Sequence, residues 1–125
     1  MDRTDLKASA IEFLTLAAAG RIDEAFERHV APGFRHHNPF FRGDAAALRE
    51  AMRAAAASHP DKTLEIHHAL ADGDQVAVFS RVRLAAAGRG VAVVHRMRFV
   101  DGRIVEIWDV GQPEPEDIAN EHGMY

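Results

Sequence analysis

The chain has 125 residues, of which 47% are apolar and 27% charged, with a net charge of −4 and no cysteine. This length and apolar content predict a single domain, residues 1–125, built on one hydrophobic core. The lack of cysteine excludes thiolate catalysis, zinc–thiolate sites and disulfides, and the scattered basic residues do not form the patch that binds nucleic acid. The apolar run near the N-terminus is too short for a signal peptide or a membrane span, so we expect a cytoplasmic protein with no membrane partner.

Three segments in the first half of the chain carry apolar residues at helical spacing. The first covers residues 6–17 and is expected to end at Gly20, and the second covers residues 23–29. The third is expected to begin after Asp44, whose carboxylate can accept a hydrogen bond from a free N–H of the first turn. Residues 34–37, between the second and third helices, are expected to form a short strand.

Apolar and polar residues alternate after Pro60, which is the pattern of half-buried strands. Four strands are predicted here, over residues 64–70, 76–84, 91–99 and 103–109. Helices followed by an antiparallel meander predict an α+β fold, in which three N-terminal helices pack on the concave face of a curved antiparallel sheet. Such a sheet is expected to leave a pocket at its open end.

The last predicted hairpin has two candidate loops. A two-residue loop, Asp101-Gly102, would place Glu106 opposite Met97 and so put a charge on the apolar face. A three-residue loop, residues 100–102, places Arg96 opposite Glu106 as a favourable pair of opposite charges. Because a slip of one residue turns every side chain of a strand to the other face, we predict the three-residue loop.

In this register His95 and Asp109 share the apolar face as diagonal neighbours, roughly 5–8 Å apart. A carboxylate in an apolar pocket loses hydration, which is expected to raise the pKa of Asp109 and to let it both accept and return a proton. His95 is expected to donate to an enolate oxygen or to orient Asp109. The alternative is structural, with Asp109 bound by backbone N–H groups at the end of the strand and His95 as its buried partner.

Further side chains are candidates for contact with a substrate: His37, Phe40, Phe41, Phe79 and Met97. His37 is expected at the mouth of the pocket and the four apolar side chains along its wall. Trp108 alternates with Asp109, so we expect it on the opposite face as a packing residue, together with Ile104. Exposed apolar groups on that face predict a homodimer.

No metal or cofactor site is expected. His67 and His68 are adjacent on a strand, so they should point to opposite faces and cannot bind one ion together. Gly88-x-Gly90 lacks the third glycine of a dinucleotide-binding fingerprint, and the sequence has no Walker A loop and no Gly-x-Ser-x-Gly elbow.

Three segments resemble a known family. Residues 34–43 (FRHHNPFFRG) resemble the QHNP…G segment of SnoaL-like proteins, and residues 71–78 (ADGDQVAV) resemble their ADGD-x-VAV hairpin. Residues 101–112 (DGRIVEIWDVGQ) resemble their DG-x-I-x-E-x-WD-V-x-Q segment. SnoaL-like proteins belong to the nuclear transport factor 2-like superfamily, which includes polyketide cyclases.

The resemblance implies a cone-shaped α+β barrel that is usually a homodimer. In the polyketide cyclases an aspartate is the acid and base of an intramolecular aldol closure, assisted by a histidine fourteen positions earlier, and His95 and Asp109 have that spacing. Many relatives have a histidine where this chain has Phe79, and others have one at Ile107. The pocket is therefore expected to be more apolar than theirs.

We therefore expect a cofactor-free acid/base enzyme, with aldol-cyclase or isomerase-like proton transfer on a small, largely apolar carbonyl compound. The first alternative is a non-catalytic small-ligand-binding or dimerisation module with the same fold. A lesser alternative is an epoxide-type hydrolase in which Asp109 activates water. Epoxide-opening relatives use two aspartates bridged by an arginine, and the sequence does not place such a trio.

Overall fold

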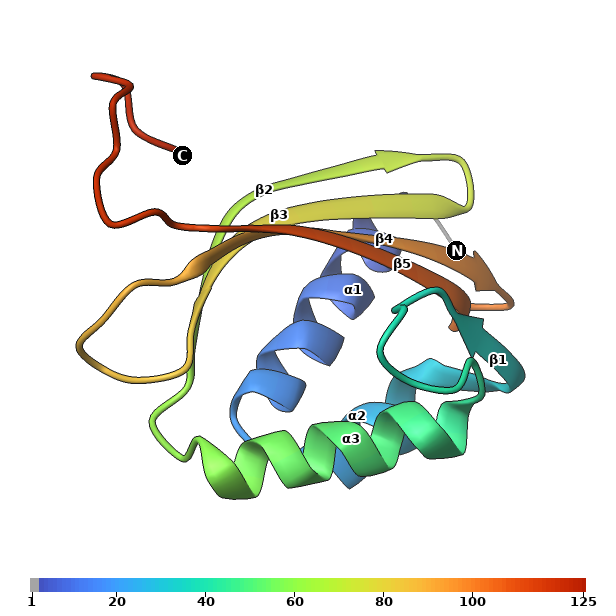
Figure 1. The fold of residues 1–125 in the computed structure, drawn as a ribbon. Helices are drawn as coiled ribbons and strands as arrows, with labels where there is room; N and C mark the ends of the chain where they lie inside the picture. The colour runs from blue at the N-terminus through green and yellow to red at the C-terminus, as the bar shows by residue number, and fades with distance from the viewer. Residues whose placement is uncertain (1–2) are drawn as a thin grey trace.

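The computed structural model describes residues 3–125, with side chains from Leu6 onward, and it confirms the α+β fold class (Figure 1). Its helices are α1 (Arg3–Ala18), α2 (Ile22–His29) and α3 (Ala45–Ser58). Its strands are β1 (Val30–His36), β2 (Thr63–Asp72), β3 (Gln75–Arg83), β4 (Val91–Val100) and β5 (Arg103–Pro113). Within residues 3–125, no helix combines the length and the apolar character needed to cross a membrane.

The five strands form one curled sheet in the order β1-β5-β4-β3-β2, and the helices lie on its concave side (Figure 1). Helix α1 runs beneath the sheet against β2 and β3, and α3 crosses below with α2. One stripe of α1 is buried, including Ala10, Phe13 and Ala17. It packs on Val76 and Val78 of β3, which are fully buried. Because this stripe is buried against the sheet, α1 forms one wall of the space on the concave side.

Strand β1 makes the sheet mixed, because it pairs in parallel with β5, with His36 next to Ile107. The other strand pairs are antiparallel, as predicted. No hairpin joins β1 to β5, so the local rules that fix the direction of neighbouring strands do not apply to this pair. The parallel pairing brings the segment after His36 beside the middle of β5.

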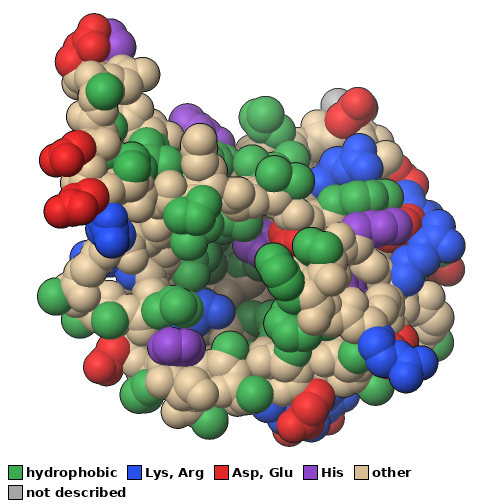
Figure 2. Space-filling view, in the orientation of Figure 1, with side chains coloured by type: hydrophobic (Ala, Val, Ile, Leu, Met, Phe, Trp, Pro, Cys, Tyr) green, Lys and Arg blue, Asp and Glu red, His purple; other side chains and the backbone are tan. Residues whose placement is uncertain are grey.

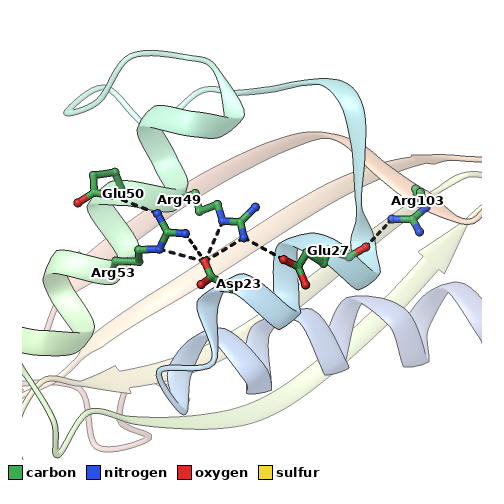
Figure 3. Close-up of polar contacts among 6 residues, drawn as sticks. All are labelled: Asp23, Glu27, Arg49, Glu50, Arg53 and Arg103. Carbon is green, nitrogen blue, oxygen red and sulfur yellow. Dashed lines mark hydrogen bonds and ion pairs between the residues drawn. The ribbon is translucent and has the colours of Figure 1, made fainter.

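Polar contacts between α2 and α3 fix the position of α3 (Figure 3). The carboxylate of Asp23 accepts hydrogen bonds from Nε of Arg49 and Nε of Arg53, each at 3.0 Å. At its start, α3 has the predicted N-cap, since Asp44 accepts from the backbone N–H of Ala47 at 3.1 Å. At the end of α2, Arg103 of β5 donates to the backbone carbonyl of Glu27. The Asp23 contacts join α3 to α2, and the Arg103 contact joins α2 to β5, so both helices are connected to the sheet.

The predicted three-residue loop of the last hairpin is wrong. Val100 pairs with Arg103, so the loop is Asp101-Gly102, and both residues have positive φ, 52° and 78°. Positive φ at both central positions is the type I′ turn, which matches the twist of a hairpin and favours Asp-Gly. The register then shifts by one residue, because Phe99 pairs with Ile104 but Arg98 pairs with Glu106.

The extra residue at this shift is Val105, which makes a β-bulge in β5. The two-residue loop pairs Ile104 with Phe99 and so turns Ile104 inward, where it is fully buried, and its predicted place on the outer face is also wrong. Beyond the bulge, His95 pairs directly with Asp109. The two are therefore opposite neighbours rather than the diagonal neighbours that the sequence predicted, and they share one face of the sheet.

A second bulge lies in β2, at His67 and His68, which the sequence predicted to point to opposite faces of the sheet. Ile66 pairs with Ser80 and His68 with Phe79, so His67 has no partner of its own. Both rings then lie near the ring of Phe79, with centroids at 6.1 Å and 6.4 Å. Strict alternation of faces does not hold at these two residues. Within the part of the chain whose side chains are described, no three His, Asp or Glu residues gather as metal ligands.

Candidate active site

A cavity of about 230 Å³ lies between α1, α3 and the concave face of the sheet. Its walls are mostly apolar, with Phe13 and Leu14 from α1 and Leu48 and Met52 from α3. Four polar residues complete the lining: Asn38, Lys62, His95 and Asp109. Figure 2 shows the hollow from its open side, with green side chains around it and purple, red and blue atoms at its margin. Its volume is below the roughly 300–1,000 Å³ of typical ligand sites, which indicates a small ligand.

Both residues that the sequence singled out for chemistry lie on this cavity. His95 of β4 and Asp109 of β5 are directly paired across the hairpin, and both are half-buried. Residues opposite each other on one face of an antiparallel pair have Cβ atoms roughly 4.5–5.5 Å apart. A ligand in the cavity can therefore contact an imidazole and a carboxylate at once.

The imidazole of His95 is neutral at neutral pH. The pKa of His95 is lowered from 6.5 to about 4, chiefly by burial; the carboxylate of Asp109 acts to raise this pKa, and the positive charge of Lys62 acts to lower it. Nδ1 of His95 is buried and has no hydrogen-bond partner among the described residues. A buried polar atom without a partner costs free energy, so a ligand group that bonds to it would bind favourably.

Asp109 is held by a side-chain amide rather than by the backbone. Nδ2 of Asn38 donates to Oδ2 of Asp109 at 3.1 Å. The amide cannot turn away, because Oδ1 of Asn38 already accepts from the backbone N–H of Phe40 at 3.0 Å. This bond occupies one oxygen of the carboxylate and leaves Oδ1 without a hydrogen bond from the described residues.

His36 anchors the loop that carries Asn38. Nδ1 of His36 accepts from the backbone N–H of Asn38 at 3.1 Å, and Nε2 lies 2.5 Å from the carbonyl oxygen of Arg42. Because Nδ1 is an acceptor, Nε2 carries the proton and donates to Arg42. The buried ring thus ties both ends of the loop together and directs Asn38 toward the cavity.

Of the five side chains predicted to contact substrate, only Phe41 lines the cavity. Phe40 is 84% exposed, outside the cavity, and Met97 is fully buried in the core beneath it. Phe79 lies on the outer face of the sheet, stacked on the ring of Tyr125 with centroids at 5.8 Å.

His37 also lies outside the cavity. Its ring is stacked on the ring of Trp108, with the two centroids 4.9 Å apart. The guanidinium carbon of Arg96 lies over the Trp108 ring, 4.0 Å from its centroid. Trp108 is therefore a packing residue on the outer face, where the sequence placed it. The carboxylate of Glu106, on the same face, accepts from Nε2 of His37 at 2.6 Å.

Glu106 is the centre of an ion cluster on the outer face. It accepts from Nε of Arg35 at 2.8 Å and from His37 and Arg98, although it is only 4% exposed. These partners, Arg35 first, lower the pKa of Glu106 from 4.5 to about 2. The cluster joins β1, β4 and β5, which carry the polar side of the cavity.

Replacing Glu106 by glutamine is expected to lower the melting temperature, because a neutral amide leaves Arg35 and Arg98 without their shared carboxylate. The folded-state pKa is below the unfolded value, so the stabilisation by Glu106 is complete above pH 4.5 and is lost as the pH falls from 4.5 toward 2. Thermal unfolding from pH 7 to pH 3 should show a smaller acid dependence in Glu106→Gln than in the wild type. Glu121→Gln, at an exposed site, is the control, and equal acid dependence in all three proteins would contradict the assignment.

Sequence reasoning missed two polar residues of the cavity, Asn38 and Lys62. Asn38 precedes Pro39 in a turn, where its side chain accepts from the backbone N–H of Phe40, and its amide also donates to Asp109. Its place in the segment that resembles SnoaL-like proteins was the available signal. Lys62 lies in the turn before β2, and nothing in its sequence neighbourhood predicts that the fold brings it to His95.

The chain is similar to one known protein family and to several proteins of known structure. The sequence model of the SnoaL-like domain matches residues 10–107. No curated protein matches the sequence significantly. AclR, a proposed hydroxylase from Streptomyces galilaeus, is 25% identical with a TM-score of 0.74, over 91% of this chain and 83% of AclR.

Two further structures share the fold at lower identity. A proposed ketosteroid isomerase from Kribbella flavida is 22% identical with a TM-score of 0.73, over 99% of this chain and 90% of its own. A proposed polyketide cyclase from Acidithiobacillus ferrooxidans is 21% identical with a TM-score of 0.70, over 86% of this chain and 87% of its own.

Proposed function

Because the chain belongs to the SnoaL-like domain family, we propose that it is a cofactor-free acid/base enzyme that moves a proton on a small carbonyl compound. One observation carries the proposal: a neutral imidazole and a carboxylate face each other directly at the wall of an apolar cavity. The similar proteins that are proposed cyclases and isomerases support it, since both reactions begin with removal of a proton next to a carbonyl.

In the proposed reaction, Asp109 removes a proton from the carbon next to the carbonyl, and the electron pair of the C–H bond moves to form an enolate. His95, as a neutral N–H donor, bonds to the enolate oxygen. Asp109 then returns the proton, either to a carbon, which gives an isomerase, or to the alkoxide formed when the enolate attacks a second carbonyl, which gives an aldol cyclase. Neither outcome consumes a co-reactant.

Asn38 supports this role by holding the carboxylate in one orientation. Its amide bonds to Oδ2 of Asp109, so we infer that Oδ1 is the oxygen that takes the proton. From Leu6 onward, where side chains are described, the lining residues of the cavity include one carboxylate and no arginine. The two-aspartate and arginine arrangement of epoxide-opening relatives is therefore not formed there, and the geometry favours proton transfer over epoxide hydrolysis.

Hydrogen–deuterium exchange tests this proposal against a binding module. In D₂O the wild type is expected to speed incorporation of deuterium next to the carbonyl of small ketones, with a rate that saturates as the ketone concentration rises. Proton NMR follows the loss of the C–H signal. A rate equal to that of buffer, together with saturable binding of the ketone, would instead support the non-catalytic alternative.

We also propose that the protein forms a homodimer through the outer face of the sheet. Val94 and Val110 are paired there and are 40% and 74% exposed, so they present apolar surface to solvent in the single chain. Light scattering should give twice the chain mass of 13.8 kDa for the wild type and a single chain mass for Val110→Lys. A wild-type monomer at micromolar concentration would contradict the proposal.

A further inference from the structure

Lys62 is a cationic residue of the cavity that the reaction proposed above does not use. It lies in the turn between α3 and β2, where its backbone N–H donates to the carbonyl of His59 at 3.2 Å. Its half-buried side chain lines the cavity together with Asn38, His95 and Asp109. Among the residues whose side chains are described, it is the only lysine or arginine in that lining.

The ammonium of Lys62 has no hydrogen bond and no ion pair with the residues whose side chains are described. The cations of the neighbouring helix differ, since Arg49 and Arg53 both bond to Asp23. Burial without a counter-ion lowers the pKa of Lys62 below its ordinary 10.5. Its charge also lowers the pKa of His95, so the two groups interact across the cavity. A partly desolvated cation without a partner favours binding of an anion.

We propose that Lys62 is an anion-binding residue and that the substrate is a short oxo acid, with a carboxylate at one end and a reactive carbonyl at the other. This proposal names a substrate class for the proton-transfer function. It rests on that function for the role of the substrate carbonyl group. The ammonium donates hydrogen bonds to the carboxylate, as charged donors do most strongly. Asp109 repels the carboxylate, so the two charged residues of the cavity orient the ligand with its carbonyl toward Asp109.

The size and walls of the cavity agree with such a ligand. A volume of about 230 Å³ suits a chain of a few carbons, and the apolar side chains between the two charged ends suit its methylene groups. Lys62 also borders a second hollow beside Thr15 and Leu64, in which it is the only ionisable residue among the described lining residues. A carboxylate bound in that hollow would not contact His95, so the location of the bound probe is part of the test.

The test compares levulinate, a ketone with a carboxylate, and levulinamide, its neutral analogue, by NMR titration of the ¹⁵N-labelled protein. The sequence has only two lysines, so Lys7→Met is a matched control for Lys62→Met. Levulinate should bind the wild type and Lys7→Met equally, and Lys62→Met about 10–100-fold more weakly, as expected for loss of a charged hydrogen bond. Levulinamide should bind all three proteins alike. Lys62→Arg should recover most of the affinity for levulinate.

Equal affinity of levulinate for the wild type and a folded Lys62→Met would overturn the proposal. The proposal would also be overturned if levulinate shifted the amide NMR signals of Thr15 and Leu64 but not those of His95 and Asp109. If Lys62→Met does not fold, the affinities of the wild type for the two ligands are compared. Tighter binding of levulinamide than of levulinate would overturn the proposal. The variant Asp109→Asn separates the anion-binding role of Lys62 from the proton-transfer role of Asp109. It should lose deuterium exchange but bind levulinate at least as well as the wild type, because a like charge is removed.

Discussion

Replacing Asp109 by asparagine is expected to slow deuterium incorporation into a bound ketone by about 10²–10⁴-fold, the usual contribution of a positioned acid/base group. Asparagine keeps the size and polarity of the side chain but cannot accept the proton. The hydrogen bond from Asn38 can be kept, because the amide oxygen of asparagine accepts as the carboxylate did. The variant should therefore fold and bind the ketone while losing turnover.

The controls for Asp109→Asn separate chemistry from structure. Asp101→Asn, in the exposed turn of the same hairpin, should keep the wild-type rate of exchange. Asn38→Ala should reduce the rate less than Asp109→Asn does, because it removes only the group that orients the carboxylate. Full exchange activity in a folded Asp109→Asn protein would reject the role of Asp109.

Acidification is expected to destabilise the protein through His95. The folded-state pKa of His95, about 4, is below its unfolded value of 6.5, so the unfolded state binds the proton first as the pH falls. Stability from this residue is complete above pH 6.5 and is lost between pH 6.5 and pH 4. The expected loss is about 2 kcal/mol between pH 7 and pH 5, and up to about 3 kcal/mol at lower pH.

Urea unfolding at pH 7 and pH 5 measures this loss. His95→Gln should remove most of the difference between the two pH values, whereas His68→Gln, at an exposed position, should leave it unchanged. This pH window separates His95 from the ion cluster on the outer face, because Glu106, with a pKa of about 2, loses its stabilisation only below pH 4.5. An identical pH dependence in the wild type and His95→Gln would show that the ring is hydrated in the folded protein.

The sequence predicted the shared face of His95 and Asp109 but not their register. A two-residue turn alone would have paired His95 with Trp108 and turned Asp109 to the outer face. The bulge at Val105 adds one residue and returns Asp109 to the concave face, opposite His95. Alternation alone cannot predict a bulge, although the adjacent apolar residues Ile104 and Val105 break the alternation at that place.

The site residues that local patterns failed to predict come from non-local contacts. His37 lies on the outer face because β1 pairs in parallel with β5, a contact between segments about 70 residues apart along the chain. The positions of Asn38 and Lys62 on the cavity depend on the same long-range packing of loops against the sheet. The three helices, the four strands of the meander and the α3 N-cap follow from local spacing and were predicted, whereas β1 begins at Val30, four residues before the predicted strand over residues 34–37.

The size of the cavity also limits which molecules the protein can bind there. A space of about 230 Å³ with a neutral imidazole, one carboxylate and one ammonium suits a short, flexible molecule better than a fused polycyclic one. Exchange assays should therefore begin with small linear ketones and oxo acids. Bulkier ketones are expected to bind only if the exposed loop with Phe40 and Phe41 moves, and to show a higher KM.

The cavity holds a neutral, dehydrated imidazole directly opposite Asp109, and the proposed proton transfer depends on this arrangement. A pH titration of the His95 ring by ¹⁵N NMR, with the signal assigned by its absence in His95→Gln, tests this most directly. We predict a ring that stays neutral from pH 8 to pH 5 and titrates with a pKa of about 4. A ring that titrates near 6.5, as in water, would contradict the claim and the proton-transfer chemistry that depends on it.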